Sequence, residues 1–321
     1  MPLLTPRTEL ARAAIVNWPQ LLEAARRQPF PEAWWLAQER DCLLIEAEAT
    51  ALAAAASANA ALSACDTRTT RPEEAVLIAR NCARAPLAAL ALVQVLRITE
   101  HLAPAQGLLT ESLAYATLQA GPEFSRWRKD YATRPALPDE GPAVCIDRHG
   151  DALSIRLNRP RARNALNIAM RDALVEAFDL LSSDASIATA TVSGAGRCYS
   201  VGGDLNEFGE RPDAPSAHRI RSLRNPALSL LRCARRVEFH VHSACIGSGI
   251  ELAAFGRRIR AHRDAYFQLP ELKLGLIPGS GGLVSLPQRI GRQRTALLAL
   301  TGRRLAAREA LAWGLVDELS D

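Results

Sequence analysis

Two glutamates lie twenty positions apart in the segment GSGIELAAFGRRIRAHRDAYFQLPE, each beside a backbone shaped by glycine or proline. Glu251 follows Gly-Ser-Gly-Ile and opens an apolar run, and Glu271 follows Gln-Leu-Pro. Charged groups among apolar residues cost free energy unless they are paired or used. Two carboxyl groups that face one small pocket can hold a water molecule and move protons as general acid and base. Because burial and a neighbouring like charge both raise a carboxyl pKa, one of the two would be protonated near neutral pH.

Each glutamate taken alone also fits a structural role. Glu251 could cap its helix or form an ion pair there, and Glu271 could pair with Lys273 or with an arginine. The two interpretations differ in what the carboxyl groups contact, and the sequence leaves both open.

Two glycine-containing turns predict backbone N–H donors near these glutamates. In CYSVGGDLNEF, residues 198–208, the Val-Gly-Gly-Asp stretch lets the backbone turn sharply. In SACIGSGIELAAF a strand gives way to a glycine turn and a helix, so N–H groups near Ser248 would point out of the helix N-terminus. Two N–H donors from two such loops form an oxyanion hole, which stabilises a carbonyl that becomes an enolate.

A basic segment, NRPRARNALN at residues 158–167, lies at a strand end just before a helix. Arg159, Arg161 and Arg163 would sit near the start of that helix, where backbone N–H groups also favour anions. The segment is interpreted either as a site for a phosphate-bearing ligand or as a solvated basic turn.

Strands and helices alternate from residue 143 onward, which indicates an α/β fold. AVCIDRH and ALSIRLN predict two short strands across a His-Gly-Asp turn, and NIAMRDALVEAFDLLSSD predicts an amphipathic helix. A strand in IATATVSG, a helix around 216–234 and a strand in VEFHVHSA follow.

The first part of the chain has a different pattern. Apolar residues recur at spacings of three and four, as in EEAVLIARNCARAPLAALALVQVL, which predicts an all-helical region over residues 1–132. TRPALPDEGP, residues 133–142, gathers proline, glycine and acidic residues and is typical of a linker. The expected organisation is therefore a helical region, a linker, and an α/β domain over residues 143–321.

Composition narrows the classes of function. The net charge of +5 is spread along the chain without a basic stripe, so no nucleic-acid partner is expected. The 7 cysteines are scattered without CxxC spacing, which is typical of reduced thiols in a cytoplasmic protein. No uninterrupted apolar stretch of about eighteen residues occurs, so no membrane span is expected.

Five segments occur in the order that they have in the crotonase family, the enoyl-CoA hydratases and isomerases. They are NRPRARNALN, SVGGDLNEF, HSACIGSGIELAAF, FQLPELKLGLIPGSGG and ALTGRRLAAREALAWGLVDEL. The chain resembles this family over about residues 143–321. The resemblance implies an α/β fold with a crotonase-like ββα spiral core and an acyl-CoA thioester as the ligand.

Carried over position by position, the resemblance implies a role for each of the residues above. The amides of Gly203 and Ser248 would form the oxyanion hole, where the family usually has glycine in place of Ser248. Glu251 and Glu271 fall on the two catalytic acids of the hydratases. The residues implied to bind the coenzyme A part of the ligand are Arg161, Arg163, Val201 and Gly202. The resemblance implies no metal, no cofactor beyond the coenzyme A of the substrate, and a homo-oligomer, either a trimer or a hexamer.

The expected reaction is hydration of a 2-enoyl-CoA to a 3-hydroxyacyl-CoA, because the spacing of Glu251 and Glu271 matches the hydratases. Other reactions of the family stay open, namely double-bond isomerisation, thioester hydrolysis and cofactor-free dioxygenation. A different class, a non-catalytic protein that binds acyl-CoA or assembles with partners, is the further alternative.

Members of the family continue past GLVDEL with helices that cover the acyl site and build the trimer, whereas this sequence ends at Asp321. Residues 75–138 resemble that tail, with an "IA…AP.AL" helix, a "GL..E...Y" helix and an "EF..W…R.P" close. We expect either that they stand in for those helices, as in a circular permutation, or that they are amphipathic helices without that relation.

Overall fold

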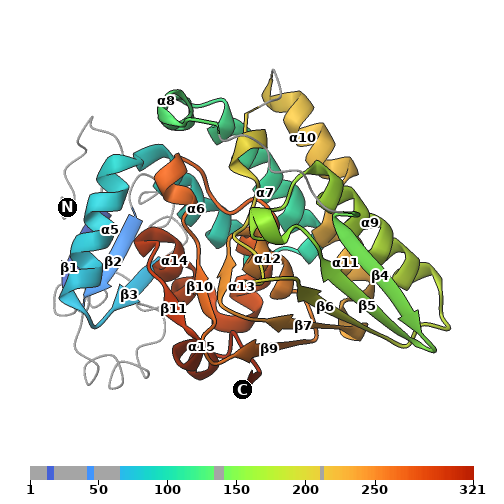
Figure 1. Ribbon diagram of the computed structural model, residues 1–321. Coiled ribbons are helices and arrows are strands. Elements are labelled where there is room, and N and C mark those ends of the chain that lie inside the picture. The colour runs from blue at the N-terminus through green and yellow to red at the C-terminus, as the bar shows by residue number, and fades with distance from the viewer. Residues whose placement is uncertain (1–12, 18–41, 47–65, 134–140, 210–212) are drawn as a thin grey trace.

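The computed structural model of the protein describes residues 13–17, 42–46, 66–133, 141–209 and 213–321. Its centre is a six-stranded sheet with the strand order β12-β9-β7-β6-β5-β4 (Figure 1). The β4–β5 pair is antiparallel and every other neighbouring pair is parallel. The strands are β4 (Val144–His149), β5 (Ala152–Leu157), β6 (Thr189–Gly194), β7 (Val237–Val241), β9 (Arg258–His262) and β12 (Glu318–Ser320). The predicted hairpin and the predicted strands in IATATVSG and VEFHVHSA are confirmed.

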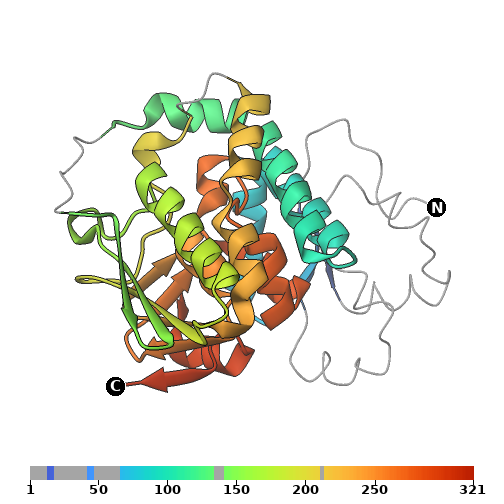
Figure 2. The same ribbon diagram turned by 90° about the vertical axis from the view of Figure 1, so that its right-hand side faces the viewer.

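α9 (Ile168–Ser183) lies against β4 and β5 of this sheet and packs against α11 (Pro226–Cys233) (Figure 2). Asn167 begins α9, because its side chain accepts a hydrogen bond from the amide of Met170. The single helix expected around 216–234 is wrong in one respect, since α10 (Ala214–Leu223) and α11 are separate helices. A proline in the first turn of a helix cannot continue the preceding one, so the chain breaks before α11.

A second, smaller sheet carries the two glutamate-bearing turns. β8 (Ala244–Ile246) and β10 (Tyr266–Gln268) are parallel neighbours, with Ile246 opposite Gln268, and β11 (Leu305–Ala306) pairs antiparallel to β10. Parallel strands in register end at the same edge of a sheet. The turn after β8 and the turn after β10 therefore leave the sheet side by side.

Five helices, one of them short, follow these turns. α12 (Ser248–Ala253) comes after β8, and the short helix η5 (Glu271–Leu274) comes after β10. The chain then continues through α13 (Gly282–Ile290), α14 (Arg292–Thr301) and α15 (Ala307–Trp313) to β12.

The prediction that residues 1–132 are all helical is wrong at three places. β1 (Ala13–Asn17), β2 (Cys42–Glu46) and β3 (Thr67–Thr69) form a parallel three-stranded sheet. Buried parallel strands need not alternate, and periodicity cannot distinguish a strand of three to five residues in an alanine-rich sequence from part of a helix. The rest of residues 1–65, and the middle of the predicted linker at 134–140, lie outside the described residues.

The helices predicted in the later part of this region are present as four elements. They are α5 (Pro72–Arg84), α6 (Pro86–Thr99), α7 (Pro104–Gln119) and α8 (Pro122–Asp130). Each begins with a proline in its first turn, where the missing N–H costs nothing. We call residues 66–133, which contain them, the helical segment.

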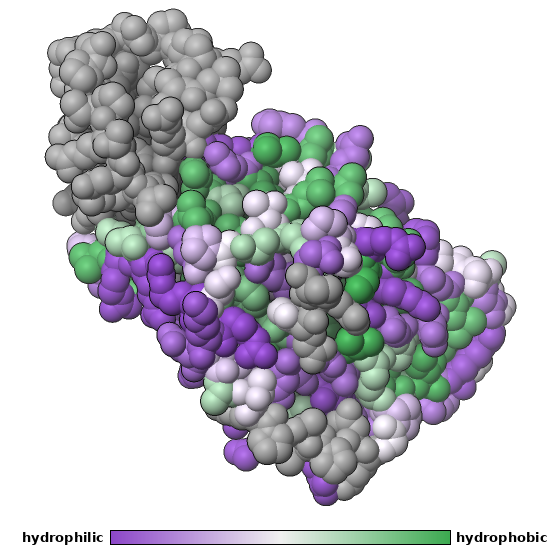
Figure 3. Space-filling model, turned by 90° about the horizontal axis from the view of Figure 1, so that it is seen from above, coloured by the Kyte–Doolittle hydropathy of each residue, from purple (hydrophilic) through white to green (hydrophobic). Residues whose placement is uncertain are grey.

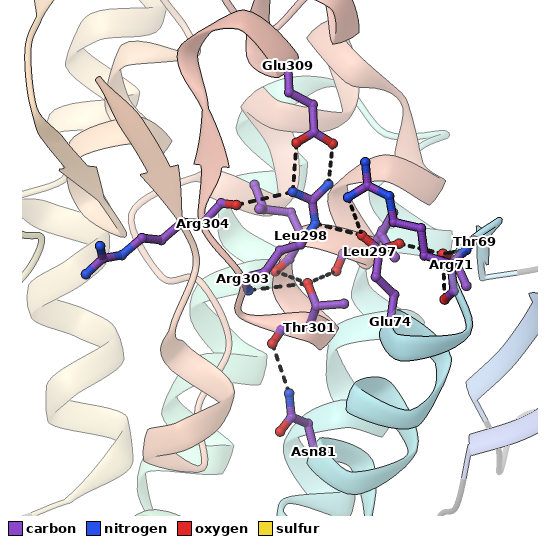
Figure 4. Close-up of polar contacts among 10 residues, drawn as sticks. All are labelled: Thr69, Arg71, Glu74, Asn81, Leu297, Leu298, Thr301, Arg303, Arg304 and Glu309. Carbon is purple, nitrogen blue, oxygen red and sulfur yellow. Dashed lines mark hydrogen bonds and ion pairs between the residues drawn. The ribbon is translucent and has the colours of Figure 1, made fainter. Parts of the chain in front are cut away.

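Polar contacts join the start of the helical segment to the end of the chain (Figure 4). Arg303 lies between two carboxylates, with its Nε 2.9 Å from Glu74 of α5 and its Nη1 2.9 Å from Glu309 of α15. The side chain of Asn81 donates hydrogen bonds to the carbonyls of Leu300 and Thr301 at the end of α14. Since the last carbonyls of a helix have no partner within it, α5 supplies what α14 lacks.

In the helical segment, α6 and α7 pack against α13, and α8 packs against η5. A Cβ built on Gly279 would lie 2.4 Å from the ring of Tyr115, and one built on Gly275 would lie 2.6 Å from the backbone of Glu123. Such close approaches need glycine at both positions. The helical segment and residues 143–321, the part that resembles the crotonase family, therefore share one packed interior. Both contribute to the same cluster of buried apolar residues.

The surface carries several exposed apolar residues, among them Val76, Leu109, Leu113 and Leu223. On the face seen from above, apolar residues lie in separate patches among polar ones (Figure 3). Among the described residues, no single helix is long and apolar enough to cross a membrane. α5 and α6 pass that test only as a pair, and the pair is bent by 112°.

Candidate active site

Glu251 lies in the first turn of α12 and is almost fully buried, at 2 % exposure. Its Oε2 accepts hydrogen bonds from the amides of Ser280, at 2.7 Å, and Gly282, at 3.0 Å. Both amides belong to the glycine-rich turn that leads into α13. A carboxylate that accepts backbone N–H bonds at a helix N-terminus is held in a fixed orientation, because each bond restrains the same group.

Glu271 begins η5 and points to the same place as Glu251. A Cβ built on Gly247 would lie 2.7 Å from Oε1 of Glu271 and 3.9 Å from Oε1 of Glu251. The two carboxyl groups therefore converge on Gly247, and only a glycine leaves room for both. The other oxygen of Glu271, Oε2, is buried and has no hydrogen-bond partner among the described residues. A buried acceptor without a partner costs free energy, which is typical of a group that serves a ligand.

The surroundings of Glu251 and Glu271 raise the pKa values of both carboxyl groups, by different causes. Burial raises the pKa of Glu251 to about 7, although the amides of Ser280 and Gly282 oppose the shift. Burial also raises the pKa of Glu271 well above its usual value, and the charges of Glu251 and Glu111 raise it further. With a pKa of about 7, Glu251 is about half ionised at neutral pH, and its charge is one of the causes that favour the protonated form of Glu271.

The ion pairs that would give the two glutamates a structural role are absent among the described residues. Neither carboxylate forms an ion pair there. Lys273, the cation nearest to Glu271 in the sequence, is an exposed residue. Glu251 does hold a helix start, but the helix is α13 rather than its own.

Two backbone amides face the same region without a protein partner. Among the described residues, neither the amide of Gly203 nor that of Ser248 donates a hydrogen bond. They lie close together, since a Cβ built on Gly203 would be 3.8 Å from the Oγ of Ser248. Both residues are half-buried, and two N–H groups that converge without a partner have the form of an oxyanion hole.

The loop that carries Gly203 is held by Asn164, a residue that the sequence reasoning did not single out. Asn164 is fully buried and adopts a left-handed conformation, with φ at 53°. Its side chain donates to the carbonyls of Ala195, Cys198 and Tyr199. Left-handed backbone is most readily adopted by glycine, asparagine and aspartate, and this preference at position 164 is the signal that could have found it.

The four residues implied to bind coenzyme A lie on neighbouring loops. Arg161 and Arg163 are exposed, while Val201 is half-buried and Gly202 is buried. The amide of Val201 donates to the carbonyl of Arg163, so the basic turn and the glycine loop are directly joined.

The third arginine of this basic turn has a different role from the one expected. Arg159 is 5 % exposed, and its Nη1 contacts Asp204 at 3.1 Å and the carbonyl of Ala165 at 2.6 Å. Its charge therefore joins the basic turn to the loop after Gly203 and is not presented to solvent. The prediction of a phosphate site on three arginines is wrong for this one.

Two residues of the helical segment complete the surroundings of the glutamates. They are the glutamate and the tyrosine of the "GL..E...Y" pattern, for which the sequence predicted no role in the site. Glu111 accepts hydrogen bonds from the turn before α13, and the ring of Tyr115 packs on Gly279. Burial raises the pKa of Tyr115, and the charges of Glu251 and Glu271 add to this. Among the residues that the structure describes, no group of three His, Cys, Asp or Glu side chains could hold a metal ion.

Comparison with known proteins agrees with this geometry. Residues 148–320 match the family described as enoyl-CoA hydratase/isomerase. Mevalonyl-coenzyme A hydratase of Beauveria bassiana is 33% identical over 175 residues, which are 52% of this chain and 62% of that protein. Human mitochondrial Delta(3,5)-Delta(2,4)-dienoyl-CoA isomerase is 34% identical over 179 residues, which are 52% of this chain and 55% of that protein.

Solved structures give the same result. The enoyl-CoA hydratase from Thermoplasma volcanium GSS1 is 35% identical, with a TM-score of 0.52 over 56% of this chain and 73% of that one. The chain thus spans less than two thirds of the length of the two relatives named above. Its family profile, its relatives and its structural neighbours all agree, and the chain belongs to the enoyl-CoA hydratase/isomerase family, the crotonases.

Proposed function

We propose that the protein adds water to the double bond of a 2-enoyl-CoA and gives a 3-hydroxyacyl-CoA. One observation carries this proposal: the carboxyl groups of Glu251 and Glu271 converge on Gly247, close to the two unpaired amides. Hydration needs an acceptor for a proton of water, a donor of a proton to carbon, and donors to the thioester oxygen. This site offers all three.

In the proposed reaction the thioester oxygen accepts hydrogen bonds from the amides of Gly203 and Ser248. A water molecule held between the two glutamates gives a proton to Glu251, and its oxygen forms a bond to C3. The electron pair of the double bond moves toward the thioester, whose oxygen gains negative charge, and C2 takes the proton of Glu271. The assignment follows from the pKa directions, because Glu251 loses its proton at a lower pH than Glu271.

The coenzyme A part of the substrate is proposed to lie over the loops that carry Arg161, Arg163, Val201 and Gly202. The exposure of both arginines supports this placement, because a phosphate can reach them from solvent. No cofactor other than this coenzyme A takes part. We also expect a homo-oligomer, which sedimentation of the purified protein would test.

A second candidate is movement of a double bond along an acyl-CoA. Isomerases are among the relatives, and the Oε2 of Glu271 has no partner among the described residues, so it is available to carry a proton between two carbons. Isomerisation does not require a water molecule between the carboxyl groups. It would show as conversion of a 3-enoyl-CoA without uptake of oxygen from water.

The test is loss of the conjugated enoyl-thioester absorbance when the purified protein meets crotonyl-CoA. The wild type should consume it, and Glu251→Gln and Glu271→Gln should each lower kcat by about 10² to 10⁴. Glu176→Gln, an exposed glutamate on α9, is the matched control and should keep the wild-type rate. If the wild type leaves crotonyl-CoA unchanged, hydration is wrong for this substrate class. Binding of the same thioester would then separate another reaction from a non-catalytic role.

We further propose that residues 75–138 take the place of the helices that cover the acyl site in other crotonases. The packing of Tyr115 on Gly279 and of α8 against η5 supports this, because it sets the helical segment against the turn before α13 and against the helix that begins with Glu271. Chain order would then differ from the family while the packing stays the same.

A further inference from the structure

A third buried carboxyl group lies next to the proposed catalytic pair, and it comes from the other half of the chain. Glu111, on α7, is 1 % exposed. Its Oε1 accepts a hydrogen bond from the amide of Gly281 at 2.7 Å, and its Oε2 accepts one from the amide of Leu283 at 2.8 Å. Each oxygen thus has its own donor, on the turn that leads into α13.

The same turn holds Glu251, and the two glutamates share its amides in alternation. The amides of Ser280 and Gly282 donate to Glu251, whereas those of Gly281 and Leu283 donate to Glu111. Successive N–H groups that point in alternating directions are thereby all satisfied by carboxylate oxygens. Release of either glutamate would free the turn that restrains the other.

Steric contacts fix this turn as well. Gly281 has φ at +99°, and a Cβ built there would lie 2.5 Å from the ring of Phe255 and 3.0 Å from Leu108 of α7. A Cβ built on Gly282 would lie 2.6 Å from Cγ of Glu251. The turn therefore has little freedom while both carboxyl groups are in place.

We propose that Glu111 is a positioning residue of the active site, supplied by the helical segment. It holds the turn 280–283 from one side so that Ser280 and Gly282 can hold Glu251 from the other. It does not touch the substrate in this proposal, which rests on the proposed function of Glu251 and Glu271.

Several charged or titratable groups face Glu111 from the elements around it. They are Glu251 on α12, Glu271 on η5, Arg221 on α10 and Tyr115 on α7 itself. Burial raises the pKa of Glu111 well above its usual value, and the charge of Glu251 adds to this, while Arg221 opposes it. Three buried carboxyl groups so close together cannot all be ionised at neutral pH. At pH values where Glu111 is ionised, its charge adds to the causes that raise the pKa of Glu271.

The test begins with Glu111→Gln, which keeps the size of the side chain. A carboxamide has one acceptor oxygen, so one of the two amides loses its partner and the turn loosens. We expect kcat with crotonyl-CoA to fall roughly tenfold to a hundredfold, as for a small misplacement of a catalytic group, with KM unchanged. The fall of kcat at high pH, where Glu271 loses its proton, should move to lower pH.

Glu123→Gln is the matched control within the same segment. Glu123 is also buried, at 8 % exposure, and also accepts two amide hydrogen bonds, from Leu87 and Ala88 at the start of α6. Glu123→Gln should lower the melting temperature as Glu111→Gln does. It should not change the pH at which kcat falls on the alkaline side of the profile. Glu111→Asp keeps a carboxyl group at this position. It should restore the pH at which kcat falls on the alkaline side, but not the full kcat. An Asp variant that behaves like the Gln variant in its pH profile would overturn the electrostatic part of the proposal.

A second readout does not depend on the reaction. Hydrogen exchange of the amides in residues 279–283, followed by mass spectrometry, should be faster in Glu111→Gln than in the wild type and unchanged in Glu123→Gln. Equal exchange in all three proteins would overturn the positioning role. If the wild type does not turn over crotonyl-CoA, the proposed function fails, and the exchange comparison still decides the role of Glu111.

Discussion

At the scale of single residues, the proposed site depends on where carboxyl protons reside. Burial raises the pKa of Glu251 to about 7, and the pKa of Glu271 is raised well above its usual value. A base and an acid of the same residue type can coexist only if their surroundings separate their pKa values. The separation here comes from the hydrogen bonds to the turn before α13, which favour the ionised form of Glu251 and not of Glu271.

This separation predicts the pH dependence of hydration. The wild-type kcat should fall about tenfold per pH unit below a pH of about 7, because Glu251 must be ionised to accept a proton from water. Steady-state rates with crotonyl-CoA, measured across this range, check the prediction. A rate that stays constant well below that pH would contradict the role of Glu251 as the base. The two limbs of the profile belong to the coupled pair rather than to one residue each.

The same shift predicts a cost in stability. The pKa of Glu251 is about 7 in the folded protein against the ordinary value of 4.5. Below the ordinary value both folded and unfolded states hold the proton, whereas between the two values only the folded state does. Stability therefore falls as pH rises through this window, by about 3 kcal/mol at about 1.4 kcal/mol per pKa unit.

Glu251→Gln lacks this titration and should gain stability relative to the wild type as pH rises. Denaturant unfolding of both proteins at about pH 5 and about pH 8 measures the difference in free energy of unfolding. The gain should be larger at the higher pH by a few kcal/mol. A difference that does not change with pH would mean that Glu251 is ionised throughout, as in an ordinary ion pair.

Sequence reasoning found residues whose neighbours along the chain already mark them. Glu251 and Glu271 stand beside glycine and proline in apolar surroundings, and the structure brings them together. Glu111 was noticed only as part of the "GL..E...Y" pattern, and no role in the site followed, because a polar residue on an amphipathic helix normally faces solvent. Arg159 was read together with its exposed neighbours, since nothing local reveals that Asp204 lies next to it. Contacts between distant parts of the chain decide both cases.

At the scale of elements, the proposed oxyanion hole depends on one turn. Gly247 has φ at 50° and ψ at −124°, the mirror image of an extended residue, which glycine adopts freely. Ser248 then begins α12 with an amide that has no partner among the described residues. A substitution at position 248 can therefore remove this N–H group with little change in the backbone conformation.

Ser248→Pro removes that N–H group and should lower kcat by roughly 10² to 10³, the usual effect of losing one oxyanion donor. Proline is tolerated in the first turn of a helix, so the fold should persist, which circular dichroism checks. Ser248→Ala keeps the amide and removes only the hydroxyl that contacts Ser280, so it should stay near the wild-type kcat. Equal losses in the two variants would place the effect in the side chain and not in the amide.

Elements were predicted from sequence where a turn bounds them or a clear pattern runs through them. The β4–β5 hairpin follows from two short strand patterns around a His-Gly-Asp turn, and α9 from its amphipathic pattern. The break between α10 and α11 was missed although Pro226 marks it. The strands β1 and β2 were missed because a mostly apolar segment of five residues is too short to show a period of its own.

At the scale of the whole molecule, two distant stretches of chain form one interior. Glu111 and Tyr115 of the helical segment contact the turn before α13, and Asn81 completes the end of α14. A buried contact of this kind depends on position in space and not on chain order. The helical segment should therefore form the same contacts if it followed residues 143–321 in the chain.

A rearranged chain tests this directly. It would begin at residue 139, run to Asp321, and continue through a Gly/Ser linker of about 20 residues, with a reach of about 25 Å, into residues 1–138. We expect it to fold and to keep the kcat and KM of the wild type for crotonyl-CoA, because every contact described above can form again. The measurements are thermal unfolding and steady-state kinetics beside the original chain.

The control for the rearranged chain is residues 139–321 alone. It lacks Glu111 and Tyr115 and exposes apolar surface of α13 and α14 that the helical segment buries, so we expect it to be inactive and prone to aggregate. If this control were as active as the wild type, the helical segment would not be part of the site. If the rearranged chain folded with wild-type stability but lost its activity, chain order itself would matter, and the equivalence with the helices of other crotonases would be wrong.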